Sequence, residues 1–159
     1  MIVKPYQVSN LNDNKSNFFL LYGQNEGQKN EVIEILLKTD LTKNIFKYDE
    51  DEIFSNYNNF VSELENKSFF EDKKIIIISR VSEKIYSLIE DLKDRNIEDI
   101  KIIINSKNLD KKSKLRSNFE KEKNLICIPF YDDNNAVLAS IASKFFFKNK
   151  IPISREMLN

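Results

Sequence analysis

The alternation of short apolar runs with amphipathic segments is the feature that most constrains how this chain can fold. Uninterrupted runs of β-branched residues, of which residues 75–78 are the clearest, predict strands that are buried on both faces. Between the runs, apolar residues recur at helical spacing. Strands that alternate with helices pair in parallel and carry helices on both faces of the sheet. The predicted strands are residues 17–22, 45–48, 74–79, 100–104 and 125–128.

Helix signals fill the intervals between these strands. One helix is predicted over residues 26–38, and a second over 53–67, where Ile53, Tyr57 and Phe60 recur on one face. A third is predicted to be capped by Ser82 and a fourth by Asp110, because short polar side chains favour the position before a helix. The fold class is therefore α/β, a three-layer sandwich around a five-stranded parallel sheet.

Residues 1–131 are predicted to form this α/β domain, with a polar lead-in that holds one short helical turn after Pro5. Pro129 is predicted to stop the last strand. Residues 132–134 (Asp-Asp-Asn) then cap a further helix, and Ser154 has the character of another helix cap. We expect residues 132–159 to be the start of a second, helical domain, with the chain cut inside it.

Composition narrows the chemistry. The sequence has no His, one Cys and a net charge of zero, so it lacks the commonest general base and metal ligand, and nothing in its total charge demands a nucleic acid. Its longest apolar runs fall far short of the roughly 20 residues that span a bilayer. We expect a reduced, cytoplasmic protein without membrane contact, metal or cofactor.

The first strand is followed by a segment that lies where a phosphate-binding loop would lie in a nucleotide-binding α/β fold. That loop needs G-x-x-x-x-G-K-[ST], so that backbone N–H groups cradle phosphates and a hydroxyl holds Mg²⁺. Here Gly27 comes one residue early after Gly23, Lys29 is followed by Asn30 instead of Ser or Thr, and Glu26 adds a negative charge. The strand 74–79 also lacks the acidic end that would hold Mg²⁺. We expect a degenerate loop without nucleotide; the alternative is a P-loop NTPase with an irregular loop.

Two other features have simple structural interpretations. Residues 49–52 (Asp-Glu-Asp-Glu) could form a metal or receiver-like acidic pocket, but they fit better as an acidic helix N-terminus. Cys127 lies between two Ile residues in a predicted strand, which favours a buried apolar role over a reactive thiol.

Ser68-Phe69-Phe70 stands between the second helix and the third strand, with charged residues on either side. Two adjacent Phe side chains at such a corner do not both point inward easily. They either tuck under the helix end as a local staple or form an exposed aromatic anchor for a partner. The residues alone leave both interpretations open.

Taken together, four segments resemble the delta subunit of the bacterial DNA polymerase III clamp loader. Phe19-Leu20-Leu21-Tyr22-Gly23 followed by Glu26 is similar to the opening strand and degenerate phosphate loop of that family. Ser68-Phe69-Phe70 resembles its clamp-binding corner, where a Leu-Phe pair is common. Residues 109–115 (Leu-Asp-Lys-Lys-Ser-Lys-Leu) resemble a helix-opening motif, and residues 134–154 resemble the start of a helical lid domain.

The resemblance implies an AAA+-like fold and a non-catalytic subunit that binds the ring-shaped sliding clamp (the beta subunit) and holds one interface open. ATP would act on other subunits. Phe69 and Phe70 would enter a hydrophobic pocket of the clamp, and Ser68 would end the helix and aim the pair. Contacts with other clamp-loader subunits would come mainly from a missing C-terminal half, and DNA would be met only indirectly. The alternatives are an NTPase or another inactive AAA+ scaffold.

Overall fold

A parallel five-stranded sheet lies at the centre of the computed structural model, which describes residues 1–11, 16–39, 44–65, 73–95, 99–152 and 154. The strand order is β2-β3-β4-β1-β5, and every pairing is parallel. The predicted α/β class with a five-stranded parallel sheet is therefore confirmed. The strands are β1 (Phe18–Gly23), β2 (Ile45–Asp49), β3 (Lys74–Val81), β4 (Ile100–Ser106) and β5 (Leu125–Phe130).

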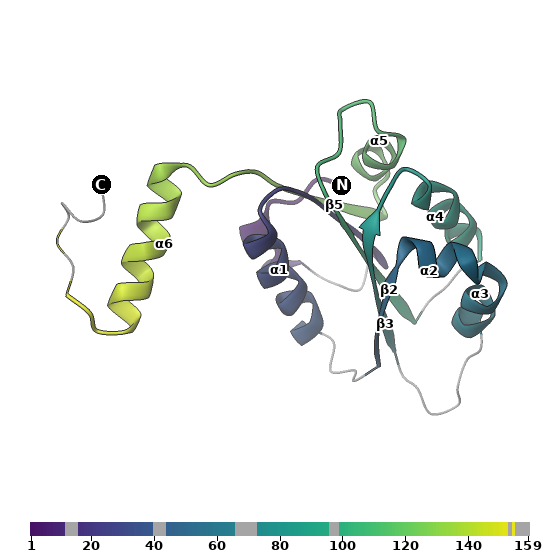
Figure 1. Ribbon diagram of the computed structural model, residues 1–159, viewed down its shortest axis with the longest axis horizontal. Helices are drawn as coiled ribbons and strands as arrows, with labels where there is room; N and C mark the ends of the chain where they lie inside the picture. The colour runs from purple at the N-terminus through teal and green to yellow at the C-terminus, as the bar shows by residue number, and fades with distance from the viewer. Residues whose placement is uncertain (12–15, 40–43, 66–72, 96–98, 153, 155–159) are drawn as a thin grey trace.

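Helices cover both faces of the sheet, which makes three layers (Figure 1). A 3-10 helix η1 (Pro5–Asn10) and helix α1 (Glu26–Thr39) pack on one face. The opposite face carries α2 (Glu50–Ser55), α3 (Tyr57–Glu65), α4 (Ile85–Asp94) and α5 (Lys114–Lys121). The predicted helical turn after Pro5 is η1.

Strand β1 shows why the apolar runs are uninterrupted. Successive side chains of a strand point to opposite faces, so Phe18, Leu20 and Tyr22 enter the core beneath α2–α5. Phe19 and Leu21 enter the second core, beneath α1 and η1. All six residues of β1 are buried, because a parallel sheet with helices on both sides leaves neither face in water.

The helix predicted over 53–67 is two helices. Asn56 leaves the helical region, with φ −138° and ψ 44°, and separates α2 from α3. Hydrophobic spacing did not reveal the break, because Ile53 and Phe60 still pack into the same core on either side of it.

Pro129 does not stop the last strand, as the sequence predicted; β5 continues to Phe130 and pairs with β1 throughout. A proline is tolerated there because β5 lies at the edge of the sheet, where no further ladder needs its missing N–H. Along its outer side, β5 meets the N-terminal segment, where the Val3 N–H donates to the Cys127 carbonyl and the Cys127 N–H donates to the Met1 carbonyl.

Two predicted caps are also displaced. Helix α4 begins three residues after Ser82, whose hydroxyl donates to Glu50 and accepts from the Lys84 N–H. Helix α5 is capped by Ser113, not Asp110, and the Ser113 hydroxyl accepts from the Arg116 N–H at 3.1 Å. In both loops the polar residue nearer the strand begins a turn, and the helix starts one turn later.

Helix α6 (Asn135–Lys148) stands apart from the sheet and its flanking helices (Figure 1). Asn134 caps it, as predicted, by accepting from the Val137 N–H at 2.9 Å. The helix has no buried residues. The prediction of a second domain over 132–159 stays a prediction; the helix expected after Ser154 lies outside the described residues.

Candidate functional site

The connection from β1 to α1 is where the sequence placed a degenerate phosphate loop. Strand β1 ends at Gly23 and α1 begins at Glu26, so only Gln24 and Asn25 join them. Gly27 is already in the first turn of the helix. A loop that cradles phosphates needs several free backbone N–H groups between strand and helix. Here the chain has too few residues between the two elements to wrap around a phosphate.

The two glycines of this connection have different roles. Gly23 has φ +130°, and a Cβ added to it would lie 1.8 Å from the Phe130 carbonyl oxygen. Only glycine fits where β1 turns away against the end of β5. A Cβ on Gly27 would meet only the Asn25 Oδ1, at 3.6 Å, which is ordinary contact. The packing around position 27 therefore does not require a glycine.

Lys29, the lysine that a phosphate loop would aim at its ligand, points into the protein. Its side chain is 1% exposed. The ammonium donates to Glu26 Oε1 at 2.6 Å and to the carbonyl oxygen of Ser106 at 2.9 Å. The lysine therefore ties α1 to the end of β4. Asn30, at the position of the missing Ser or Thr, is an exposed residue of α1.

A carboxylate from the far side of the sequence also reaches this connection. Asp133, which lies between β5 and α6, accepts from the Asn25 side-chain amide at 2.8 Å and from the Gln28 side-chain amide at 2.7 Å. Asn25 in turn caps α1, since its Oδ1 accepts from the Gln28 N–H at 3.1 Å. Sequence reasoning missed Asp133, because no local pattern pairs residues more than a hundred positions apart.

At the end of β3 there is a cation instead of an acid. Arg80 has φ +54°, which is uncommon for a residue with a side chain, and its guanidinium pairs with Asp49. The buried carboxylate of Glu50 accepts from the Ser82 N–H at 2.6 Å and from its hydroxyl at 2.5 Å. Asp49 thus holds the end of β3, and Glu50 holds the β3–α4 loop.

Helix α2 shows which of the two interpretations of the acidic residues 49–52 is right. Asp49 and Glu52 form a capping box in which each side chain accepts from the backbone of the other. The predicted role of residues 49–52 as an acidic helix N-terminus is confirmed. Within the described ranges, no group of three or more Cys, Asp or Glu side chains is arranged to hold a metal ion.

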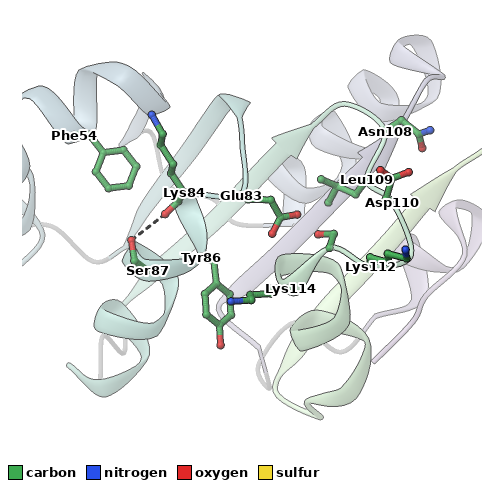
Figure 2. Close-up of a pocket in the computed structure, with 11 residues that line it drawn as sticks. Phe54, Glu83, Lys84, Tyr86, Ser87, Asn108, Leu109, Asp110, Lys112 and Lys114 are labelled. Carbon is green, nitrogen blue, oxygen red and sulfur yellow. Dashed lines mark hydrogen bonds between the residues drawn. The ribbon is translucent and has the colours of Figure 1, made fainter.

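A cavity of about 970 Å³ lies between α2, α4 and α5, at the carboxyl edge of the sheet, where the β1–α1 connection also lies. Phe54 and Lys84 lie on one side of it, and Asp110 and Lys112 on the other (Figure 2). Its charged lining is mixed, since Glu83 and Asp110 stand among three lysines. Such a lining selects no single charge of ligand.

The Leu109–Leu115 segment that carried part of the resemblance lines this cavity and organises its wall. Leu109 and Leu115 are both in the core, so they anchor the two ends of the segment. Ser113 between them is buried and caps α5. The motif therefore works as a structural unit that turns the chain from β4 into α5.

Tyr22 lies near the end of β1, in the core beneath α2–α5. It is buried, and the Arg116 guanidinium lies over its ring at 5.0 Å from the centroid. Burial raises the pKa of the Tyr22 hydroxyl far above its ordinary value. Burial likewise raises the pKa of the Cys127 thiol to about 12. Cys127 is fully buried, which confirms its predicted apolar role.

Ser68, Phe69 and Phe70, the predicted clamp-binding residues, lie outside the described residues. On either side of the undescribed residues 66–72, α3 ends at Glu65 and β3 begins at Lys74. The start of β3 is the amino edge of the parallel sheet, whereas the β1–α1 connection and the cavity lie at the carboxyl edge. In the part of the chain that is described, no helix has both the length and the apolar character to cross a membrane.

Comparison with known proteins identifies the fold. No model of a known protein family matches the sequence, and no curated protein matches it. Among solved structures, the chain is similar to the DNA clamp loader delta protein of Bacillus subtilis, with a TM-score of 0.63 and 13% identity over 96% of this chain and 49% of that one. It is also similar to domain III of the replication initiation protein DnaA of Thermotoga maritima, with a TM-score of 0.51 and 12% identity over 98% of this chain and 71% of that one.

The chain thus spans about half the length of the delta protein. At these identities the likeness establishes the fold. It confirms the predicted α/β architecture, since both solved structures, a clamp loader delta protein and a DnaA domain, share this fold with the chain.

Proposed function

We propose that this chain is a non-catalytic, delta-type clamp-loader subunit, which binds a sliding clamp and holds one of its interfaces open without hydrolysing ATP. The observation that carries the proposal is the β1–α1 connection. In a fold similar to that of a clamp loader delta protein, the lysine that would serve ATP is buried and bonded within the chain.

The electrostatics of the connection support the absence of nucleotide. The Lys29 ammonium already has two acceptors, Glu26 and the Ser106 carbonyl. The carboxylates of Glu26 and Asp133 place two negative charges beside the start of α1, where the helix dipole would otherwise favour a phosphate. A triphosphate would have to displace one carboxylate and approach the other.

Clamp binding is assigned to Ser68, Phe69 and Phe70 on the resemblance to the delta family. Adjacent aromatic side chains are strong anchors, because burying each Phe stabilises a complex by about 1.5–3 kcal/mol. The proposal further includes a cytoplasmic complex with the other clamp-loader subunits, and DNA met only within that complex. Contacts with those subunits would use the part of a delta-type protein that lies beyond the half matched by this chain.

Titration calorimetry against a sliding clamp tests the anchor. Phe69→Ala combined with Phe70→Ala should weaken binding by about 3–6 kcal/mol, while circular dichroism shows an unchanged fold. The matched control is Phe147→Ala, which removes another Phe, 87% exposed, from α6. Unchanged affinity in the double variant, or an equal loss in the control, would contradict the proposal.

Titration with Mg²⁺-ATP tests the second half of the proposal. We expect no binding heat and no phosphate release, because Lys29 is already bonded within the chain and only two residues join β1 to α1. Micromolar binding that is lost in Lys29→Met would instead favour a P-loop NTPase with an irregular loop.

A further inference from the structure

We infer that Asn25 and Gln28 form a carboxylate-binding site at the N-terminus of α1, that its ligand is Asp133 of the same chain, and that this contact fixes the segment which leads to α6. This inference does not depend on whether the chain binds a sliding clamp or a nucleotide.

The contacts define the site. Asp133 offers one carboxylate oxygen to each amide: Oδ2 to the Asn25 Nδ2 at 2.8 Å, and Oδ1 to the Gln28 Nε2 at 2.7 Å. Hydrogen bonds to a charged acceptor are the short and strong ones. All three side chains are partly buried, which limits the competition from water.

The helix itself adds to this affinity. Helix α1 is fourteen residues long, and its first turn leaves backbone N–H groups and the positive end of the helix dipole facing the connection. An anion is stabilised at this place, and Asp133 supplies one from within the chain. Any free phosphate or nucleotide would have to displace a tethered carboxylate whose effective concentration is high.

The contact of Asp133 also bears on the position of α6. Strand β5 ends at Phe130 and α6 begins at Asn135, so the join is short. Tyr131 and Asp132 in this join are exposed. Among the described residues, the two bonds of Asp133 are the side-chain hydrogen bonds that connect residues 131–150 with the rest of the chain.

Asp133 lies at a place in the chain from which its contact can orient α6. Asp133 immediately precedes Asn134, the residue that caps α6. A helix of this length extends about 20 Å, so the orientation of the residue just before its cap governs where the far end lies. We therefore assign to Asp133 the task of setting the direction of α6, and with it the placement of the exposed Leu138, Ile141 and Phe145.

Pulsed electron paramagnetic resonance tests the inference. Nitroxide labels at Glu31→Cys on α1 and Ser140→Cys on α6, two exposed positions, report the distance between the helices in a Cys127→Ala background. We expect one narrow distance peak in the parent protein and loss of that peak in Gln28→Glu, because two carboxylates then face each other.

Gln28→Glu separates this contact from helix stability. Position 28 is the third residue of α1, where a glutamate is favourable to the helix, so the urea midpoint should not fall. Gln28→Lys keeps a donor for Asp133 and should keep the narrow peak. Asp132→Asn, a change at the exposed neighbouring acid, should keep it too.

Exchange of the partners completes the test. Gln28→Glu combined with Asp133→Asn restores a donor opposite an acceptor and should bring the narrow peak back. A peak that survives in Gln28→Glu, or one that is lost equally in Asp132→Asn, would overturn the inference. Neither result bears on clamp binding, which is measured separately.

Discussion

Alanine substitution of the two glycines in the β1–α1 connection should have opposite effects on stability. At Gly23 an alanine meets two costs. Holding a non-glycine residue in a sparsely populated region such as φ +130° costs about 1–3 kcal/mol. Its Cβ would also lie 1.8 Å from the Phe130 carbonyl oxygen, although real Cβ atoms essentially never come within 3.0 Å. Strands β1 and β5 would have to separate where Gly23 pairs with Phe130.

Together these costs should reach about 4 kcal/mol or more, a loss that few single substitutions cause. Gly27→Ala is the matched control. Gly27 lies in the first turn of α1 and has ordinary space for a Cβ, so alanine should stabilise the protein by about 0.5–1 kcal/mol.

Urea denaturation followed by circular dichroism measures both effects. With a slope of roughly 2 kcal/mol per molar urea, Gly23→Ala should lower the midpoint by about 2 M, and Gly27→Ala should raise it by about 0.3–0.5 M. The reasoning is refuted if Gly23→Ala unfolds at the same urea concentration as the parent protein. A loss of stability in Gly27→Ala would instead mean that this glycine has a backbone role of the kind a phosphate loop needs.

Two further predictions concern buried groups. Lys29→Met should lower the free energy of unfolding by about 1–3 kcal/mol, since it leaves the Ser106 carbonyl without its charged donor. The control is Lys38→Met, at a lysine that is 78% exposed. In the same urea assay this control should change the free energy of unfolding by less than about 0.5 kcal/mol. The Cys127 thiol has a pKa of about 12 in the folded protein against an ordinary 9.0, so the unfolded chain releases its proton first and stability should fall as pH rises above 9. Between pH 8 and 10.5 this loss should be about 2 kcal/mol larger in the parent protein than in Cys127→Ala; equal slopes would contradict the assignment.

The sheet could be predicted from the sequence because burial on two faces leaves a local mark. The runs at 18–23 and 75–78 are buried and almost wholly apolar, and strands of a parallel sheet that is covered on both faces show that pattern. The break at Asn56 and the passage of β5 through Pro129 left no such mark. Whether a strand is an edge strand, and whether a helix restarts on the same face, depends on tertiary neighbours that periodicity does not report.

The candidate site divides in the same way. The departure of the β1–α1 connection from the phosphate-loop pattern was visible in the sequence, because the spacing of Gly23, Gly27 and Lys29 and the identity of Asn30 are local facts. The partners of the loop were not, since Ser106 and Asp133 lie 77 and 105 positions from the residues that they bond. A glutamate at position 26 was identified as a barrier to phosphate, but its ion pair with Lys29 required the geometry of the helix turn.

At the β1–α1 connection and at the end of β3, the charged side chains have partners within the chain, and this bears on whether a small anion binds there. Lys29 pairs with Glu26, and Arg80 with Asp49. Glu50 is satisfied by Ser82, and Asp133 by two amides. Parallel α/β sheets bind small ligands at this edge, and at the β1–α1 connection the charges that could hold a small anion are engaged within the chain. The cavity farther along the edge keeps its mixed lining of two acids and three lysines. This is why the proposed function assigns the chain a protein partner and not a nucleotide. The choice of Phe69 and Phe70 within that proposal comes from the resemblance to the delta family, and the engaged charges of the β1–α1 connection argue against a small anion as the competing ligand.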